Sequence, residues 1–335
     1  MKIYLIAAAD ISVGGDLAAA RGLIGSAKAA GADAVKFSSF RAETLAHGLF
    51  AADQHSFLRN CELSREVLFE LTAACHEADI DFTASAADFD AVDLLCELGS
   101  QTIRISSGDA TNLPLIAYAA QHNVPLFIST GMCSLGEAAD AYYCAIEEGA
   151  PRVVLLHATS AYPTPVEEVN LQAISTLAGE LFCEVGYSDH AAGLDCCIGA
   201  AALGAKVIEK HLRLEGTADN DRSASACDAA QFTELTVRLR VMEQAVGDGE
   251  KRLMPSEVQN AEHVRRSVFY SRDMAAGERI NWGDLAFLRP VIGLSPAEAY
   301  RFVGRTLGVD MQAGELASEQ DIAVVELKEK AVKEE

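Results

Sequence analysis

Residues 184–211, EVGYSDHAAGLDCCIGAAALGAKVIEKH, decide the fold of this chain. Two short apolar strands, each followed by a histidine, flank a small-residue stretch at 194–203 that predicts a crossover helix. Strands joined in this way are parallel neighbours, so His190 and His211 are expected at adjacent strand ends. Such a pair of imidazoles can hold one divalent metal ion, with open positions for water and substrate. The alternative is two polar residues satisfied by hydrogen bonds, and the position of the pair at strand ends favours the metal.

A glycine followed by a short apolar strand recurs through the first 247 residues, at Gly31, Gly99, Gly149 and Gly204. Glycine suits the left-handed position just past a helix, and β-branched residues suit a buried parallel strand. Eight strand–helix units in this length are typical of a (β/α)8 TIM barrel. A doubly wound open sheet is the alternative, but no glycine-rich dinucleotide fingerprint follows the first strand. The predicted strands lie near 3–8, 34–37, 81–85, 102–105, 126–129, 153–157, 184–187 and 207–211, and the predicted helices near 16–30, 65–77, 91–98, 113–121, 135–148, 171–179, 194–203 and 229–246.

The remaining residues predict a second, smaller domain. Residues 1–247 form the barrel domain, and the polar segment 248–264 is expected to be a linker. Short β-like pieces alternate with turn signals over 265–325, which indicates a small β-rich domain. The last ten residues, 326–335, form a charged tail that is expected to fray.

Composition narrows the possible partners. The 335 residues carry a formal net charge of −22, and a surface this acidic repels nucleic acid and anionic membranes. The nine cysteines are scattered without a CxxC motif, which is typical of a reduced, cytoplasmic protein. No cleavable signal and no apolar run long enough to span a bilayer is evident. An anionic substrate would therefore need a local basic pocket or a metal ion.

Such a pocket is predicted at the strand ends, where the loops of a barrel build its site. Lys36 and Arg104 end two predicted strands, and Ser129 and Ser188 end two others. A lysine, an arginine, serines and backbone N–H groups in one mouth are the groups that a phosphate or carboxylate needs. Each residue alone is equally consistent with a solvated strand end, but their convergence on one face favours an anion site beside the metal pair.

Several stretches together resemble the sialic acid synthases over about residues 1–325. They are AGADAVKF at 30–37, SGD at 107–109, STGM at 129–132, AYPTP at 161–165, GYSDH at 186–190, EKH at 209–211, RRS at 265–267 and RP at 289–290. The resemblance implies a TIM barrel joined to a small domain that resembles type III antifreeze protein, the SAF domain. It also implies condensation of phosphoenolpyruvate with an N-acetylated aldose, using Mn²⁺ or Mg²⁺, to give phosphate and a nine-carbon 2-keto acid. The implied assembly is a domain-swapped homodimer in which one chain's small domain covers the other's barrel mouth.

The resemblance also implies roles for individual residues. His190 and His211 would hold the metal, and Asp109 would lie at an acidic position near the reacting centre. Arg289 would reach across the dimer. Tyr162 and Asp221 would face the sugar. The residues that would surround phosphoenolpyruvate are Lys36, Arg104, Ser107, Ser129, Ser160 and Ser188, with Arg104 in place of the family's lysine.

Other positions depart from the family pattern, mostly on the acceptor side. A glutamate that contacts the sugar falls on Ala8, and Asp10 can replace it only if the following loop is rebuilt. The family's histidine falls on Val13, and its glutamine on Ser38. The small residues Ala86 and Ala87 replace a proline and a phenylalanine, and the family's Gly-Pro-Asp-His stretch reads DNDR at 219–222.

Three interpretations remain open. The first is a working synthase with a different acceptor, in which Ala8, Ala86 and Ala87 open space for a larger sugar and Arg222 meets an acidic or phosphorylated one. The second is an ordinary N-acetylneuraminate-type synthase with compensating changes. The third is a non-catalytic relative that binds a ligand or partner. We favour the first, because the expected metal and phosphoenolpyruvate residues are mostly present while the acceptor residues are replaced.

Overall fold

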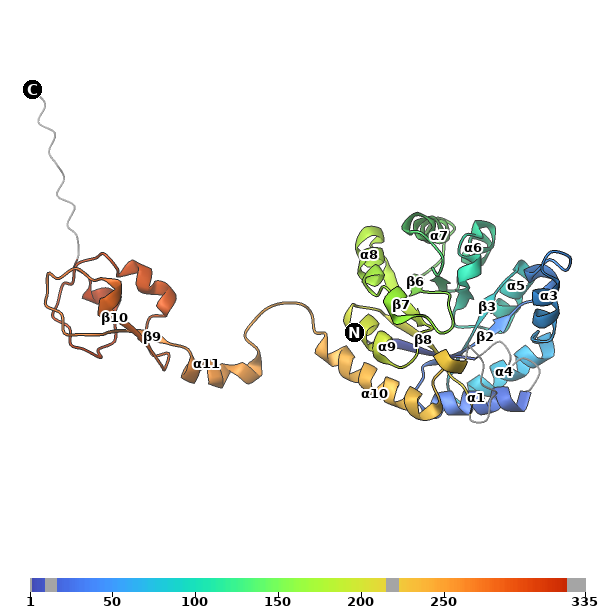
Figure 1. The fold of residues 1–335 in the computed structure, drawn as a ribbon, viewed down its shortest axis with the longest axis horizontal. Helices are drawn as coiled ribbons and strands as arrows, with labels where there is room; N and C mark the ends of the chain where they lie inside the picture. The colour runs from blue at the N-terminus through green and yellow to red at the C-terminus, as the bar shows by residue number, and fades with distance from the viewer. Residues whose placement is uncertain (1, 10–16, 215–222, 324–335) are drawn as a thin grey trace, which may run out of the picture. The chain divides into compact units, whose positions relative to one another are not determined.

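The computed structural model describes residues 2–9, 17–214 and 223–323, and Figure 1 shows its course. The chain divides into two compact units between Gly249 and Glu250.

The first unit is a closed barrel of parallel strands in the order β1 to β8, which confirms the predicted fold class. The first strand pairs with the last over the whole length of β1, so the sheet has no free edge. The strands are β1 Tyr4–Ala8, β2 Ala34–Ser39, β3 Asp81–Ala86, β4 Ile103–Ile105, β5 Leu126–Ser129, β6 Val153–Ala158, β7 Glu184–Asp189 and β8 Val207–His211.

Helices connect successive strands, as the glycine pattern predicts. Positive φ angles occur at four glycines, each in the short connection between a helix and the next strand: Gly31, Gly99, Gly149 and Gly204. The helices of this unit are α1 Leu17–Ala29, α2 Ala42–Leu45, α3 Ala52–Arg59, α4 Arg65–Glu77, α5 Phe89–Glu97, α6 Leu113–Ala120, α7 Leu135–Glu147, α8 Gln172–Leu181, α9 Asp195–Ala202 and α10 Ala229–Ala245. Short 3₁₀ helices are η2 Ser107–Asp109, η3 Val166–Glu168 and η4 Ser223–Ser225.

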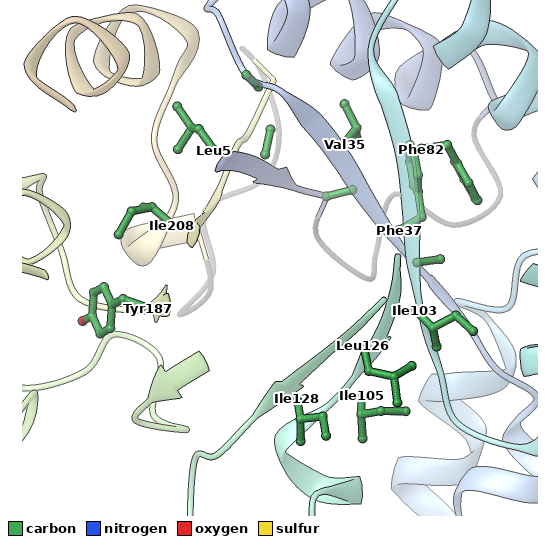
Figure 2. Close-up of a cluster of buried hydrophobic side chains, with 14 of the residues drawn as sticks. Leu5, Val35, Phe37, Phe82, Ile103, Ile105, Leu126, Ile128, Tyr187 and Ile208 are labelled. Atoms are coloured by element: carbon green, nitrogen blue, oxygen red, sulfur yellow. The ribbon is translucent and has the colours of Figure 1, made fainter. Parts of the chain in front are cut away.

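Alternation along the strands separates two apolar cores. Side chains such as Leu5, Val35 and Phe37 lie in the core shared by the strands and the surrounding helices, shown in Figure 2. A smaller core is formed by side chains at the alternate positions and includes Ile6, Phe127, Val154, Leu156 and Val207. Fully burying one such side chain stabilises the fold by about 1.5–3 kcal/mol. The two cores fix which strand residues face the barrel interior.

Gly186 shows how tightly the barrel interior is packed. A Cβ atom there would lie 2.5 Å from Leu156 Cδ2 and 2.6 Å from the Val207 carbonyl oxygen. Only glycine allows this approach between neighbouring strands. This close packing fixes the position of β7, the strand that carries Ser188 and ends just before His190.

The second unit is small and has its own core. Strands β9 Ser267–Tyr270 and β10 Leu285–Leu288 pair antiparallel, and the apolar cluster includes Val268, Tyr270 and Phe302. Helix α11 Val258–Val264 occupies part of the segment predicted as a linker. The 3₁₀ helices here are η5 Pro255–Glu257, η6 Trp282–Asp284, η7 Pro296–Arg301 and η8 Glu319–Asp321. The predicted tail, 326–335, lies outside the described residues.

Over the described residues, none of the helices has both the length and the apolar character needed to cross a membrane. The nine cysteines all lie among the described residues, and each is a free thiol.

Candidate active site

The carboxyl ends of the barrel strands surround a cavity of about 220 Å³. Its walls come from the ends of strands and the loops after them, where a TIM barrel carries its chemistry. Eight of the residues predicted from the sequence line it: Lys36, Arg104, Ser107, Ser129, Ser160, Tyr162, His190 and His211. The cavity is also lined by Ala9, Ser38, Ser106, Gly108, Met132 and Glu209.

Glu209 organises the floor of this cavity, although the sequence analysis gave it no role. Its two carboxylate oxygens accept hydrogen bonds from Arg104 Nε and Nη2, each at 3.1 Å. Ser188 Oγ donates to Glu209 Oε1 at 2.8 Å, and Lys36 Nζ lies 3.8 Å from the same oxygen. The only sequence signal was alternation, which puts Glu209 on the same side of β8 as Val207 and His211. Two cations and one carboxylate leave a net positive charge on the floor.

The neighbouring cations set the protonation state of Glu209. Burial by itself raises the pKa of Glu209, but Arg104 and Lys36 outweigh it and hold that pKa far below its ordinary value. Glu209 is therefore a carboxylate at neutral pH. Arg104 directs three of its nitrogens at Glu209 and the Ile105 carbonyl, whereas Lys36 makes a longer contact and is 12% exposed. Both cations line the cavity.

A cluster of serines forms one wall around Gly131. Ser107 Oγ donates to Ser129 Oγ at 2.9 Å and accepts a hydrogen bond from the Gly131 N–H at 3.1 Å. A Cβ on Gly131 would lie 2.7 Å from Ser107 Oγ and would also collide with Ser160 Oγ. Glycine lets the backbone approach both hydroxyls, and hydroxyls beside a backbone loop are suited to the oxygens of a phosphate or carboxylate.

The two histidines lie together at the cavity with Tyr162. The ring centroids of His190 and His211 are 5.8 Å apart, and the Tyr162 ring is 4.2 Å from that of His190. His190 Nδ1 is 2.8 Å from the Thr159 carbonyl oxygen, which can only accept, so the proton lies on Nδ1. His190 Nε2 then presents its lone pair to the cavity side, where the Tyr162 hydroxyl lies 3.1 Å away.

This arrangement fits a metal ion as a pair of ligands. Burial lowers the pKa of His190 against the opposing hydrogen bond to Thr159, so the imidazole is neutral at pH 7, the form that binds metals. A carbonyl behind the ligand nitrogen is the usual way in which proteins orient such a histidine. Within the described ranges, no group of three or more His, Cys, Asp or Glu side chains is placed to hold an ion. Any further ligands would come from water, substrate or residues outside those ranges.

The other predicted site residues lie elsewhere. Ser188 is buried behind the cavity, where it supports Glu209. Asp109 ends η2 beside the serine wall but does not line the cavity, and its pKa is raised by burial against a hydrogen bond from Asn112. Arg289 belongs to the second unit, next to a cis peptide bond with Pro290. Asp221 lies outside the described residues.

The alanines expected to open acceptor space are not equivalent. Ala8 pairs in register with both Lys36 and His211, is fully buried, and does not itself line the cavity. Ala86 is buried in the core between strands and helices, and Ala87 packs on the cluster formed around Phe40. The expectation of added space at Ala86 is therefore wrong, because strand alternation turns Ala86 away from the cavity. Ala87 is partly buried and does not line the cavity. Asp10, Val13 and Arg222 lie outside the described residues.

Comparisons with known proteins identify the family of both units. The model of the NeuB family matches residues 23–251, and the model of the SAF domain matches residues 265–323. The chain is 35% identical over 332 residues to an N,N′-diacetyllegionaminic acid synthase of Legionella pneumophila, covering 94% of this chain and 93% of the relative. It is 30% identical over 331 residues to an N-acetylneuraminate-9-phosphate synthase of Homo sapiens, covering 95% and 92%.

Solved structures show the same fold. An N-acetylneuraminic acid synthetase from Leptospira borgpetersenii superposes with a TM-score of 0.74 at 27% identity, covering 78% of this chain and 91% of that one.

Proposed function

This chain belongs to the NeuB family, the sialic acid synthases, and on that premise we propose that it condenses phosphoenolpyruvate with an aldose. The products are a 2-keto-3-deoxy sugar acid and inorganic phosphate. The observation that carries the proposal is the convergence of Lys36, Arg104, the serine wall and the two histidines on one cavity.

In this proposal each part of the cavity has one task. Lys36 and the serines around Gly131 bind the phosphate and carboxylate oxygens of phosphoenolpyruvate. Arg104 holds Glu209, and the pair keeps the floor charged and rigid. Tyr162 lies at the aldehyde end beside His190, where its hydroxyl can orient the acceptor. Asp109, whose pKa is raised by burial, is the acidic group closest in sequence to the serine wall and is proposed to accept or give a proton.

We further propose that His190 and His211 hold Mn²⁺ or Mg²⁺. Such an ion, when bound, polarises the aldehyde oxygen of the acceptor. Residues of this chain would position the ion, since Thr159 fixes the His190 tautomer and β8 carries His211 beside Ala8.

The acceptor is proposed to differ from an ordinary N-acetylated hexosamine. Ala8 puts a methyl group between Lys36 and His211, where the family resemblance expects a carboxylate that contacts the sugar. We propose that the shorter side chain lets the acceptor carry a further substituent. An N-acetylneuraminate-type synthase is the second candidate, favoured by the 30% identity to the human relative.

We propose that the working unit is a homodimer in which the second unit of one chain serves the barrel of its partner. The supporting features are the resemblance at Arg289-Pro290 and the SAF match over 265–323. We place the enzyme in the cytoplasm, where reducing conditions keep its thiols free.

Phosphate release provides the test. The full chain would be incubated with phosphoenolpyruvate, Mn²⁺ and a panel of aldoses that includes N-acetylmannosamine and hexoses with further N-acyl substituents. Release that requires both Mn²⁺ and an aldose, with a modified hexose preferred, is the expected result. Equal turnover of N-acetylmannosamine would contradict the altered acceptor. No release with any aldose, together with no Mn²⁺ binding, would refute the enzyme and leave a non-catalytic binding protein.

Residue 8 offers a matched variant for this assay. We expect Ala8→Glu to shift the preference toward N-acetylmannosamine and away from bulkier acceptors. Ala86→Glu is no useful comparison, since it would bury a charge in the core. The control is Ala230→Glu, at an exposed position on α10. An unchanged preference in Ala8→Glu would separate this position from acceptor choice.

A further inference from the structure

A buried ion pair lies on the outer face of the barrel sheet, and the proposed reaction does not use it. Lys210 Nζ is 2.7 Å from Asp189 Oδ2, and both side chains are 0% exposed. The two residues pair in register across β7 and β8, on the opposite side of the sheet from Ser188 and Glu209. Apolar residues often replace such a pair without loss of stability, because taking two charges out of water is costly. Stability alone is therefore a weak reason for this pair.

Both members of the pair hold the backbone of Ala191. Asp189 Oδ1 accepts a hydrogen bond from the Ala191 N–H at 2.9 Å, and Lys210 Nζ donates to the Ala191 carbonyl oxygen at 2.5 Å. Asp189 is itself fixed by the Tyr187 hydroxyl at 2.9 Å and by Cys197 Sγ at 3.1 Å. The peptide groups on both sides of Ala191 are thus clamped by one ion pair.

This clamp adjoins both candidate metal ligands. Asp189 and Ala191 flank His190, and Lys210 precedes His211. The His190 carbonyl oxygen also accepts a hydrogen bond from the Thr164 N–H at 2.9 Å, which ties the same turn to the Tyr162 segment. A shift of Ala191 would move His190 relative to His211. We propose that Asp189 and Lys210 are positioning residues that set the separation of the two histidines and hence the affinity for a divalent ion.

The metal part of this inference rests on the proposed function, so the experiment has a second readout. Two neutral double variants are compared in the full chain: Asp189→Asn with Lys210→Met, and Asp189→Asn with Lys210→Gln. Neither leaves a buried charge unpaired. Methionine removes the donor to the Ala191 carbonyl, whereas the glutamine amide keeps one. The measurements are Mn²⁺ binding by calorimetry, hydrogen exchange of the 187–193 segment by mass spectrometry, and the melting temperature.

We expect the methionine variant to lose about 10–100-fold in Mn²⁺ affinity. Its 187–193 amides should exchange faster, and the glutamine variant should recover most of both properties at a similar melting temperature. Glu184→Gln, which breaks the half-exposed pair with Arg152 at the other end of β7, should leave both readouts unchanged.

Wild-type affinity and wild-type exchange in the methionine variant would overturn the inference. Equal losses in both double variants would also overturn it, because the donor to Ala191 would then not matter. If the unmodified chain binds no Mn²⁺, the proposed metal fails, and the exchange data alone decide whether the pair positions the turn.

Discussion

At the scale of single residues, the bidentate ion pair between Arg104 and Glu209 is the contact that shapes the cavity floor. Two guanidinium nitrogens meet two carboxylate oxygens at equal distances of 3.1 Å, a geometry that an ammonium group cannot reproduce. The family resemblance expects a lysine here, so this arginine changes the geometry while it keeps the charge. Alternation along β8 could have predicted the inward Glu209, but its partner on a strand about a hundred residues away could not be read from local sequence.

Arg104→Lys is expected to weaken this contact. Hydrogen bonds to charged groups contribute about 1.5–3 kcal/mol, and losing one of the two should lower the free energy of unfolding by about that amount. Urea denaturation measures it. Arg152→Lys at the half-exposed pair with Glu184 is the comparison, with a loss below about 1 kcal/mol. Equal losses in the two variants would show that the buried fork has no special strength.

His190→Ala should abolish metal-dependent turnover while the barrel stays folded. The reason is that the hydrogen bond from His190 Nδ1 to the Thr159 carbonyl oxygen leaves the Nε2 lone pair available on the cavity side. Phosphate release and far-ultraviolet circular dichroism measure the two properties. His122→Ala, which removes an imidazole bound to Asp93 on the outer helices, should retain activity. Near wild-type turnover of His190→Ala with added Mn²⁺ would show that the ligand assignment is wrong.

Gly131→Ala should raise KM for phosphoenolpyruvate because the added Cβ displaces Ser107 and Ser160. A misplacement of about 1 Å in an active site can cost about 100-fold in rate, which sets the expected scale for kcat/KM. Gly136→Ala is the matched control, since a Cβ there meets nothing closer than 4.0 Å. Unchanged kinetics in Gly131→Ala would remove the serine wall from the binding site.

At the scale of elements, the sequence analysis located the helices around the barrel but missed α2 and α3. Periodicity is weak over 42–59, and Leu49 and Phe50 are 86% and 90% exposed. What holds this segment is a satellite cluster of Phe40, Leu58 and neighbouring small residues. Such packing depends on contacts made after the strands have closed, so local propensity carries little information about it.

Asp33 links three elements at the other end of the barrel. Its Oδ2 accepts hydrogen bonds from the Leu5 N–H of β1 and from Arg240 of α10, both at 2.9 Å. Burial raises the pKa of Asp33, but these bonds and Lys2 hold it below the ordinary 3.8. A depressed pKa means that the stabilisation is present above that ordinary value and is lost as the pH falls through the folded-state pKa.

Asp33→Asn should therefore destabilise the barrel more at pH 7 than at pH 3. The amide keeps an acceptor but loses the charge, so the expected loss at pH 7 is about 1 kcal/mol. Urea unfolding of both proteins at both pH values measures it, and the difference between them isolates Asp33 from other carboxylates. The same difference at both pH values would contradict the role of its charge.

For the whole molecule, charge is distributed unevenly, because this acidic protein places two cations in its candidate site. The net charge is −22, yet the cavity floor combines Lys36 and Arg104 with a single carboxylate. The net negative charge repels an anionic substrate at long range, and the cations of this cavity attract it locally. The composition predicted the need for such a site, and the barrel supplied it.

The proposed homodimer predicts complementation between damaged chains. Arg289→Ala and His190→Ala chains are each expected to be nearly inactive. If one chain's second unit serves its partner's barrel, a mixture should regain activity, since half of the sites in a heterodimer keep both residues. Co-expression with two affinity tags yields verified heterodimers for the phosphate-release assay. Inactive heterodimers would argue against a shared site.

The barrel, its strand ends and the pair of histidines can be predicted from the sequence alone, because they follow from local periodicity and the direction of parallel strands. The sequence also carried the motifs that the NeuB and SAF models match. Which side chains meet across the cavity could be seen only in the folded barrel. The tertiary structure assigned Glu209 to the floor, Ser188 to its support and Ala86 to the outer core. These outcomes depend on contacts between distant strands, whose geometry is fixed only when the barrel closes.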